Sequence, residues 1–218
     1  MGSSLQEAKE EVLNTAQLIY KEGLVSETWG NVSARVTDNE IIITPSGIPY
    51  NHLHFSDLVL VSNQGNIQEG ERRPSTELPL HLAIYNAREE IKGIVHTHST
   101  YSTVFAVSRM ELPVIIEEQA QVIGGPVKVS RYALPGSEEL AQYAVETLGN
   151  EGTAVLLANH GLVTTGENLK LALRKCRVME RSALIFLWSS TLGTPAVLGP
   201  EEVRKLRNGF LYHYGQKE

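Results

Sequence analysis

The hydrophobic positions along the chain change between helical and extended spacing, which predicts a mixed α/β fold. Between residues 5 and 22, apolar side chains recur at helical intervals, so that one face of a helix is apolar. Runs of β-branched and apolar residues such as 154–158 are instead typical of buried strands. Helices are predicted at 5–22, 76–88, 99–108, 138–148, 167–190 and 200–210, and strands at 41–44, 57–62, 67–69, 94–98, 114–117, 127–130 and 154–158.

Polar and glycine residues mark where several of these elements begin and end. Ser4 and Glu7 have the spacing of a capping box before the first helix, and Gly23 follows its last predicted turn. The run 63–66 separates two short extended segments and predicts a β-hairpin. Ser137 is a typical N-cap for the helix that follows it.

The length and composition are those of an ordinary globular domain. The 218 residues include 42% hydrophobic and 20% charged residues, and we expect one domain over residues 1–218. Residues 1–4 lack the order of a signal peptide and are expected to be disordered or left over from cloning. No apolar run reaches the ~20 residues that cross a bilayer, so we expect no membrane partner and a cytoplasmic location.

Charge and cysteine usage narrow the function further. The net charge of −6 argues against nucleic acid as a partner, because phosphate backbones are bound by basic faces. A small phosphorylated substrate is still compatible, since one local group of donors is enough to hold it. Cys176 is the only cysteine, which excludes an intramolecular disulfide, and we expect it to be buried in its helix.

Three histidines end or follow strongly apolar segments and are candidate metal ligands. His96 and His98 are two positions apart on a predicted strand, so their side chains point to the same face. His160 comes shortly after the apolar strand 154–158. Three imidazoles with one open position are the arrangement of a catalytic zinc site. Taken alone, the His-x-His spacing is more typical of two half-exposed histidines at a strand end.

Glu77 stands at the start of a predicted helix. A glutamate in that position commonly does no more than complement the helix dipole. His81, four residues later, could reach the same site. His52, His54 and His213 lie in a loop and in the tail, and we expect no chemical role for them.

Three segments combine hydroxyl groups with free backbone amides, which suits an anion: 28–33, 44–47 and 75–76. The last of them lies at a helix start, where unpaired N–H groups and the helix dipole favour negative charge. Each one alone is equally typical of an ordinary turn or helix cap. No nucleotide-binding glycine motif is present.

These motifs, in this order, resemble the class II aldolase/adducin family over nearly the whole chain, from about residue 5 to residue 215. Each motif is common, but the ordered set is specific: Thr28-Trp29-Gly30-Asn31-Val32-Ser33, Thr44-Pro45-Ser46-Gly47, Pro74-Ser75-Thr76-Glu77, His96-Thr97-His98-Ser99 and Asn159-His160-Gly161.

The resemblance implies a single three-layer α/β domain, with a central and mainly antiparallel sheet flanked by helices. It implies a homotetramer with sites at subunit interfaces and Zn²⁺ as the cofactor, one ion per subunit. The ligands would be His96, His98 and His160, with Glu77 as the base and as a fourth ligand until substrate binds. The residues implied to hold the substrate phosphate are Asn31, Thr44, Gly47, Ser75 and Thr76.

Within the family, the motifs are most similar to those of L-fuculose-1-phosphate aldolases. This implies cleavage of a ketose 1-phosphate to dihydroxyacetone phosphate and an aldehyde. An acid must protonate the oxygen of the departing aldehyde. The resemblance implies that tyrosines do this. Tyr214, in the tail 200–218, matches one of them and would reach a neighbouring subunit. The other is absent near Glu117 and Glu118. Either a glutamate, Glu118, acts in its place, or the reaction differs, or these glutamates only face solvent at a subunit edge.

Some motifs also resemble L-ribulose-5-phosphate 4-epimerases, which use the same zinc platform. Glu77 stands where the epimerases have aspartate, and no aspartate lies between Pro113 and Gly125. These differences favour the aldolase, with dehydratases and decarboxylases of the family as further alternatives. A non-enzymatic module like adducin is disfavoured because all three histidines and Glu77 are present.

Overall fold

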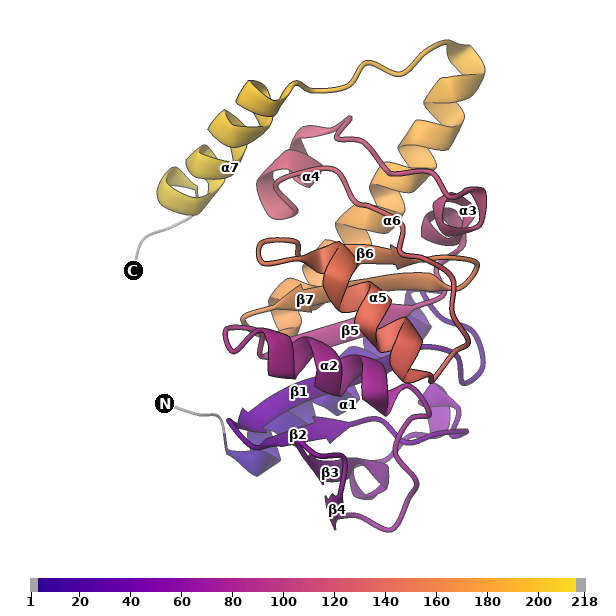
Figure 1. Cartoon of the computed structure of the whole chain (residues 1–218), viewed down its shortest axis with the longest axis vertical. Coiled ribbons are helices and arrows are strands. Elements are labelled where there is room, and N and C mark those ends of the chain that lie inside the picture. The colour runs from indigo at the N-terminus through magenta and orange to yellow at the C-terminus, as the bar shows by residue number, and fades with distance from the viewer. Residues whose placement is uncertain (1–3, 215–218) are drawn as a thin grey trace.

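Seven strands form one sheet in the order β4-β3-β2-β1-β5-β7-β6, and every neighbouring pair is antiparallel. The structure, a computed structural model, describes residues 4–214. The sheet lies between helical layers (Figure 1), as predicted from the sequence. The strands are β1 Asn31–Thr37, β2 Glu40–Ile43, β3 Val59–Ser62, β4 Ile67–Glu69, β5 Gly93–Thr97, β6 Ala154–Leu157 and β7 Gly161–Gly166.

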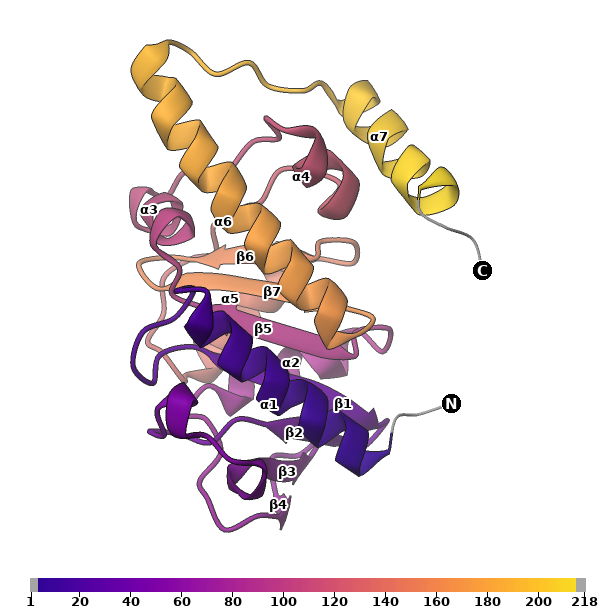
Figure 2. The ribbon, with the colours of Figure 1, turned by 180° about the vertical axis from the view of Figure 1, so that it is seen from behind.

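Helices cover both faces of the sheet. Helices α2 and α5 lie over one face (Figure 1), and α1 and α6 lie over the other (Figure 2). Each layer buries its own apolar cluster against the strands. The helices are α1 Leu5–Lys21, α2 Leu78–Ala87, α3 Thr100–Ser108, α4 Glu117–Val122, α5 Glu138–Leu148, α6 Leu169–Leu192 and α7 Pro200–His213, with short 3₁₀ turns η1 Tyr50–His52 and η2 Phe55–Asp57.

Helix α1 begins at the predicted capping box and buries its predicted apolar face. The Ser4 hydroxyl accepts from the Glu7 amide at 3.2 Å, and the Glu7 carboxylate accepts from the Ser4 amide at 2.8 Å. This capping box confirms the prediction, and residues 1–3 of the expected disordered leader lie outside the described residues. The apolar stripe, including Ala8, Val12 and Ile19, is fully buried against the sheet.

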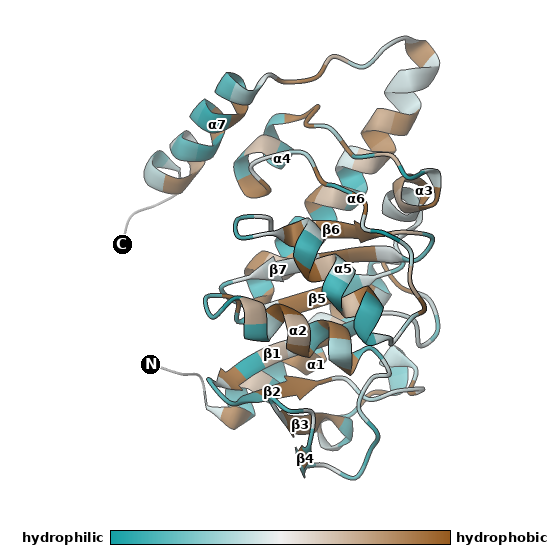
Figure 3. Cartoon of the chain, viewed as in Figure 1, coloured by the Kyte–Doolittle hydropathy of each residue, from teal (hydrophilic) through white to brown (hydrophobic). Residues whose placement is uncertain are grey.

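Helices α4 and α7 pack against each other beyond the end of the sheet. Val114, Ala120 and Val203 form a small buried cluster between them. Figure 3 shows apolar residues concentrated in the strands and on the sheet-facing sides of the helices, whereas α7 is largely hydrophilic. The helix predicted at 200–210 continues to His213, and Tyr214 follows as its C-cap.

Several elements differ between the prediction and the structure. The strands predicted at 114–117 and 127–130 are absent, because these segments pair only through isolated bridges at Leu112–Val127 and Val129–Leu156. Strands β1 and β7 were not predicted. The predicted strand 94–98 ends at Thr97, so His98 lies one residue beyond it.

Cys176 is fully buried in α6, as predicted, and burial raises the pKa of its thiol to about 12. Across residues 4–214, the structure contains no helix with the length and apolar character needed to cross a bilayer.

Candidate metal centre and substrate cavity

His96 is placed by the centre of the sheet. It lies on β5 opposite Val163 of β7 and opposite Asn31 of β1. Its Nδ1 atom donates to the Leu162 carbonyl at 3.0 Å, because a carbonyl oxygen only accepts. In the neutral ring the Nε2 lone pair is then free and faces the other candidate ligands. The sheet therefore sets both the tautomer and the direction of this imidazole.

His98 and His160 come from two loops at the same edge of the sheet. His98 follows β5, and His160 lies in the turn between β6 and β7, shortly after the strand predicted at 154–158. A side chain at Gly161 would place its Cβ 2.3 Å from the Thr97 carbonyl oxygen. Only glycine permits this approach, which brings the His160 turn against the end of β5.

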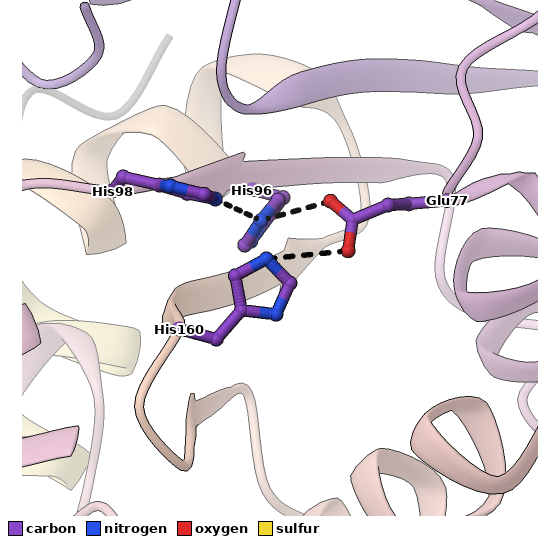
Figure 4. A group of neighbouring side chains, drawn as sticks. All are labelled: Glu77, His96, His98 and His160. Atoms are coloured by element: carbon purple, nitrogen blue, oxygen red, sulfur yellow. Dashed lines mark hydrogen bonds and ion pairs between the residues drawn. The ribbon is translucent and has the colours of Figure 1, made fainter. Parts of the chain in front are cut away.

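Glu77 is the N-cap residue of α2, and its side chain turns into the protein instead of toward the helix amides. The carboxylate is buried, and its Oε2 accepts from Asn31 Nδ2 at 2.9 Å. Oε2 also lies 3.0 Å from His96 Nε2, and Oε1 lies 3.3 Å from His160 Nε2. Figure 4 shows the carboxylate and the three imidazoles pointing toward one another.

The spacing of these four side chains fits a small divalent cation. Their ligand atoms all lie within 4.8 Å of one another, and His96 Nε2 is 3.0 Å from His98 Nε2. A tetrahedral zinc with bonds of ~2.0–2.1 Å separates its ligand atoms by ~3.3–3.4 Å, close to the observed distances. Within residues 4–214, Glu77 Oε1 is buried and has no hydrogen-bond donor. The donor set therefore fits a metal.

Electrostatics favour the protonation state that a metal requires at three of the four side chains, Glu77, His98 and His160. Burial raises the pKa of Glu77, but the adjacent His96, His160 and Asn31 outweigh this effect and hold the pKa well below its usual value. Burial, followed by the charge of His96, lowers the pKa of His98 to about 3 and that of His160 to about 4. Near neutral pH, an ionised carboxylate thus faces neutral imidazoles at His98 and His160, ready to coordinate.

A cavity of about 610 Å³ opens beside the cluster. Four of the five residues predicted to hold phosphate line it, namely Asn31, Gly47, Ser75 and Thr76. Thr44 does not line it; its hydroxyl is buried and accepts from the Val32 amide at 3.2 Å. The Ser75 amide donates to the Thr44 carbonyl at 3.0 Å, so the two predicted anion segments are joined.

Three residues considered for the site lie apart from the cluster. Glu118 is exposed on α4, with Arg181 4.0 Å away as its ion-pair partner, and does not line the cavity. Tyr214 is 74% exposed and stacks on Phe210. His81 is not among the clustered ligands, because its ring is buried one layer behind Glu77, against Asn31.

The sequence did not predict that some of the residues lining the cavity would lie there. Tyr132, Ala133 and Pro135 line the cavity from the segment before α5, which carries no distinctive motif. Trp29 lies within a motif that was recognised, yet its position at the cavity, 58% exposed, required the structure.

The fold and the cluster define the class of protein to which this chain belongs. Residues 10–187 match the model of the family described as class II aldolase and adducin N-terminal domain. The chain is a member of that family, which confirms the resemblance found in the sequence.

Relatives and solved structures agree with this membership. The chain is 35% identical to a 5-deoxy-D-ribulose 1-phosphate aldolase of Bacillus thuringiensis, over 98% of this chain and 99% of the relative. It is 31% identical to the L-ribulose-5-phosphate 4-epimerase UlaF of Salmonella paratyphi B, over 98% and 100%. A solved L-fuculose 1-phosphate aldolase superposes with a TM-score of 0.91 at 35% identity, covering 97% of this chain and 99% of that structure. These findings support the prediction of a metal-dependent lyase.

Proposed function

We propose that the protein is a zinc-dependent aldolase that cleaves a ketose 1-phosphate to dihydroxyacetone phosphate and an aldehyde. The observation that carries the proposal is the placement of a buried carboxylate, three converging imidazoles and a group of anion donors around one cavity. Aldol cleavage needs these three parts: a positive centre, a proton acceptor and a clamp on the substrate.

The phosphate clamp is the first of these parts. Ser75 and Thr76 come just before α2 and line the cavity with their hydroxyl groups, although the Ser75 amide is already bonded to the Thr44 carbonyl and the Glu77 amide to the Ser75 hydroxyl. Gly47 has a positive φ of +74°, a conformation that glycine adopts without strain. We place the substrate phosphate among these residues and Asn31. Holding the phosphate there would orient the reacting carbon relative to Glu77, so that remote binding energy positions the chemistry.

Glu77 is the proposed base. When bound, zinc would stabilise the negative charge that develops on the substrate oxygens as the carbon–carbon bond breaks. Glu77 would exchange the proton at the nucleophilic carbon, since its carboxylate is ionised at neutral pH and reaches the same cavity. His96, His98 and His160 would hold the metal through neutral ring nitrogens.

A product assay tests the reaction and separates the two leading alternatives. We expect dihydroxyacetone phosphate, measured with a coupled dehydrogenase, from L-fuculose 1-phosphate or 5-deoxy-D-ribulose 1-phosphate, and no release from the unphosphorylated ketoses. The epimerase is a second candidate, because an epimerase relative matches the full chain. Conversion of L-ribulose 5-phosphate to D-xylulose 5-phosphate without triose formation would favour the epimerase over the aldolase.

We further propose a homotetramer in which Tyr214 acts as an acid in a neighbouring subunit's site, and in which Glu118 acts as an acid in place of the absent tyrosine. In its own chain, Tyr214 lies outside the cavity and is largely exposed, as are the nearby apolar side chains Leu211 and Tyr212. Exposed apolar groups of this kind are typical of a surface that another subunit covers. The expected location in the cytoplasm is part of the same proposal.

Subunit complementation tests this arrangement. The variants Tyr214→Phe and Glu77→Gln are each expected to be nearly inactive alone. In mixed oligomers, a site can combine the intact Glu77 of one chain with the intact Tyr214 of another. An equal random mixture should therefore restore about one quarter of the sites. Mixed oligomers that stay as inactive as the separate variants would show that Tyr214 does not act across the interface.

A further inference from the structure

A buried row of polar side chains leads from Glu77 to Asn31, His81 and Ser33. Asn31 Nδ2 contacts Glu77 Oε2 at 2.9 Å, and Asn31 Oδ1 contacts His81 Nε2 at 2.5 Å. His81 Nδ1 in turn contacts the Ser33 hydroxyl at 2.6 Å. Asn31 is 3% exposed, and Ser33 and His81 are not exposed at all, so water does not compete for these bonds.

Strand β1 and helix α2 present their facing side chains at nearly equal intervals along their axes. Asn31, Ser33 and Arg35 follow one face of β1, whereas Glu77, His81 and Tyr85 follow one face of α2. Two residues of a strand rise ~6.6 Å and four residues of a helix rise ~6.0 Å, so the two rows stay nearly in step. Besides the bonds above, the Ser33 hydroxyl lies 2.9 Å from the Tyr85 hydroxyl, and Arg35 donates to the Tyr85 carbonyl at 2.6 Å.

The donors in this row all point toward Glu77. The ionised carboxylate only accepts, so the Asn31 amide nitrogen faces it and the Asn31 oxygen faces His81. That oxygen also only accepts, so the proton of His81 is on Nε2. Burial keeps His81 neutral by lowering its pKa to about 3, which leaves Nδ1 to accept from Ser33. The bonds therefore run from Ser33 to His81, to Asn31, to Glu77.

We propose that His81, held in its Nε2–H tautomer by Ser33, is a positioning residue for Glu77 and acts through Asn31. The row fixes Oε2 of the carboxylate and places a donor on it. Oε1, which has no donor among residues 4–214, is left as the more basic oxygen, available for the metal and for the proton. The two oxygens of the proposed base are thereby made different, and this assignment rests on the proposed function.

The tautomer can be measured without metal or substrate. In metal-free protein labelled with ¹⁵N-histidine, the His81 signals are assigned by their loss in His81→Gln. We expect the proton on Nε2 in the wild-type protein. A proton on Nδ1 would overturn the proposal, because Asn31 would then have no donor from His81.

Variants test the positioning itself. His81→Leu removes the donor and should weaken zinc binding, measured by chelator competition, by about 10–100-fold, as is typical for groups that orient metal ligands. His81→Gln can return an N–H to Asn31 and should recover most of this loss. In the loaded enzyme, kcat should follow the same order while KM stays within about twofold. If folded His81→Leu keeps wild-type zinc affinity and kcat, the proposal is wrong.

A matched pair of serine variants covers the case in which His81→Leu does not fold. Ser33 and Ser182 are both fully buried, and Ser182 Oγ bonds to the Val178 carbonyl within α6, away from the cavity. Ser33→Ala should lower zinc affinity and kcat several-fold, whereas Ser182→Ala should change neither. Equal effects of the two variants would assign Ser33 and His81 a structural role only.

A wild-type protein that binds no zinc would overturn the proposed function, while the tautomer measurement would still stand.

Discussion

Replacing Glu77 by glutamine is expected to leave a folded, zinc-binding protein whose kcat is lower by roughly 100- to 10,000-fold, the range for loss of a general base. Glutamine has the same shape, and its oxygen can still accept from the Asn31 amide. It cannot take up the proton, because an amide is not basic. The kcat is measured with the coupled triose assay, and circular dichroism and metal analysis show whether fold and zinc are retained.

The matched control is Glu10→Gln, an exposed glutamate on α1 that does not line the cavity. It undergoes the same chemical change and should retain wild-type turnover. If Glu77→Gln also turns over at the wild-type rate, Glu77 has no part in proton transfer. If Glu77→Gln loses zinc together with activity, the loss of a metal ligand explains the result and the role as base needs separate evidence.

His96→Ala is expected to have the largest effect on the metal. Its ring is fully buried, fixed by Leu162, and close to both Glu77 and His98, so no side chain can move in to replace it. We expect about one zinc per chain in the wild-type protein. The affinity of the variant should fall by more than about 100-fold, beyond the effect of groups that only orient ligands. Metal analysis of purified protein and chelator competition measure this change.

His52→Ala provides the control for His96→Ala, because His52 is exposed in η1, outside the cluster. Its zinc content should equal that of the wild-type protein. Unchanged zinc in His96→Ala would refute the ligand assignment. The same experiment with cobalt or manganese in the buffer shows which metal is preferred, since three imidazoles and a carboxylate accept several divalent ions.

Much of the fold was readable from local patterns. The apolar stripe of α1 and the apolar runs of β5 and β6 predicted these elements because burial imposes a regular period on the sequence. Strand β1 was missed even though Val32, Ala34 and Val36 alternate with polar residues. The polar positions suggested a phosphate loop, whereas they form the buried face that meets α2.

Two strands were predicted from composition but do not form in the structure. The segments 114–117 and 127–130 have strand-like composition, yet they make only isolated bridges in the structure. Extended segments become strands only when a partner offers a continuous ladder, and that depends on the tertiary arrangement.

The sequence alone determined the family, and it predicted the four side chains that the structure brings together as a candidate metal centre, because metal binding restricts which side chains can serve. Only the tertiary structure decided that β1 pairs with β5, so that Asn31 lies opposite His96, and that His81 supports Glu77 through Asn31. These neighbours are far apart in the chain. Their pairing is set by sheet register and helix packing, which leave no local periodicity in the sequence.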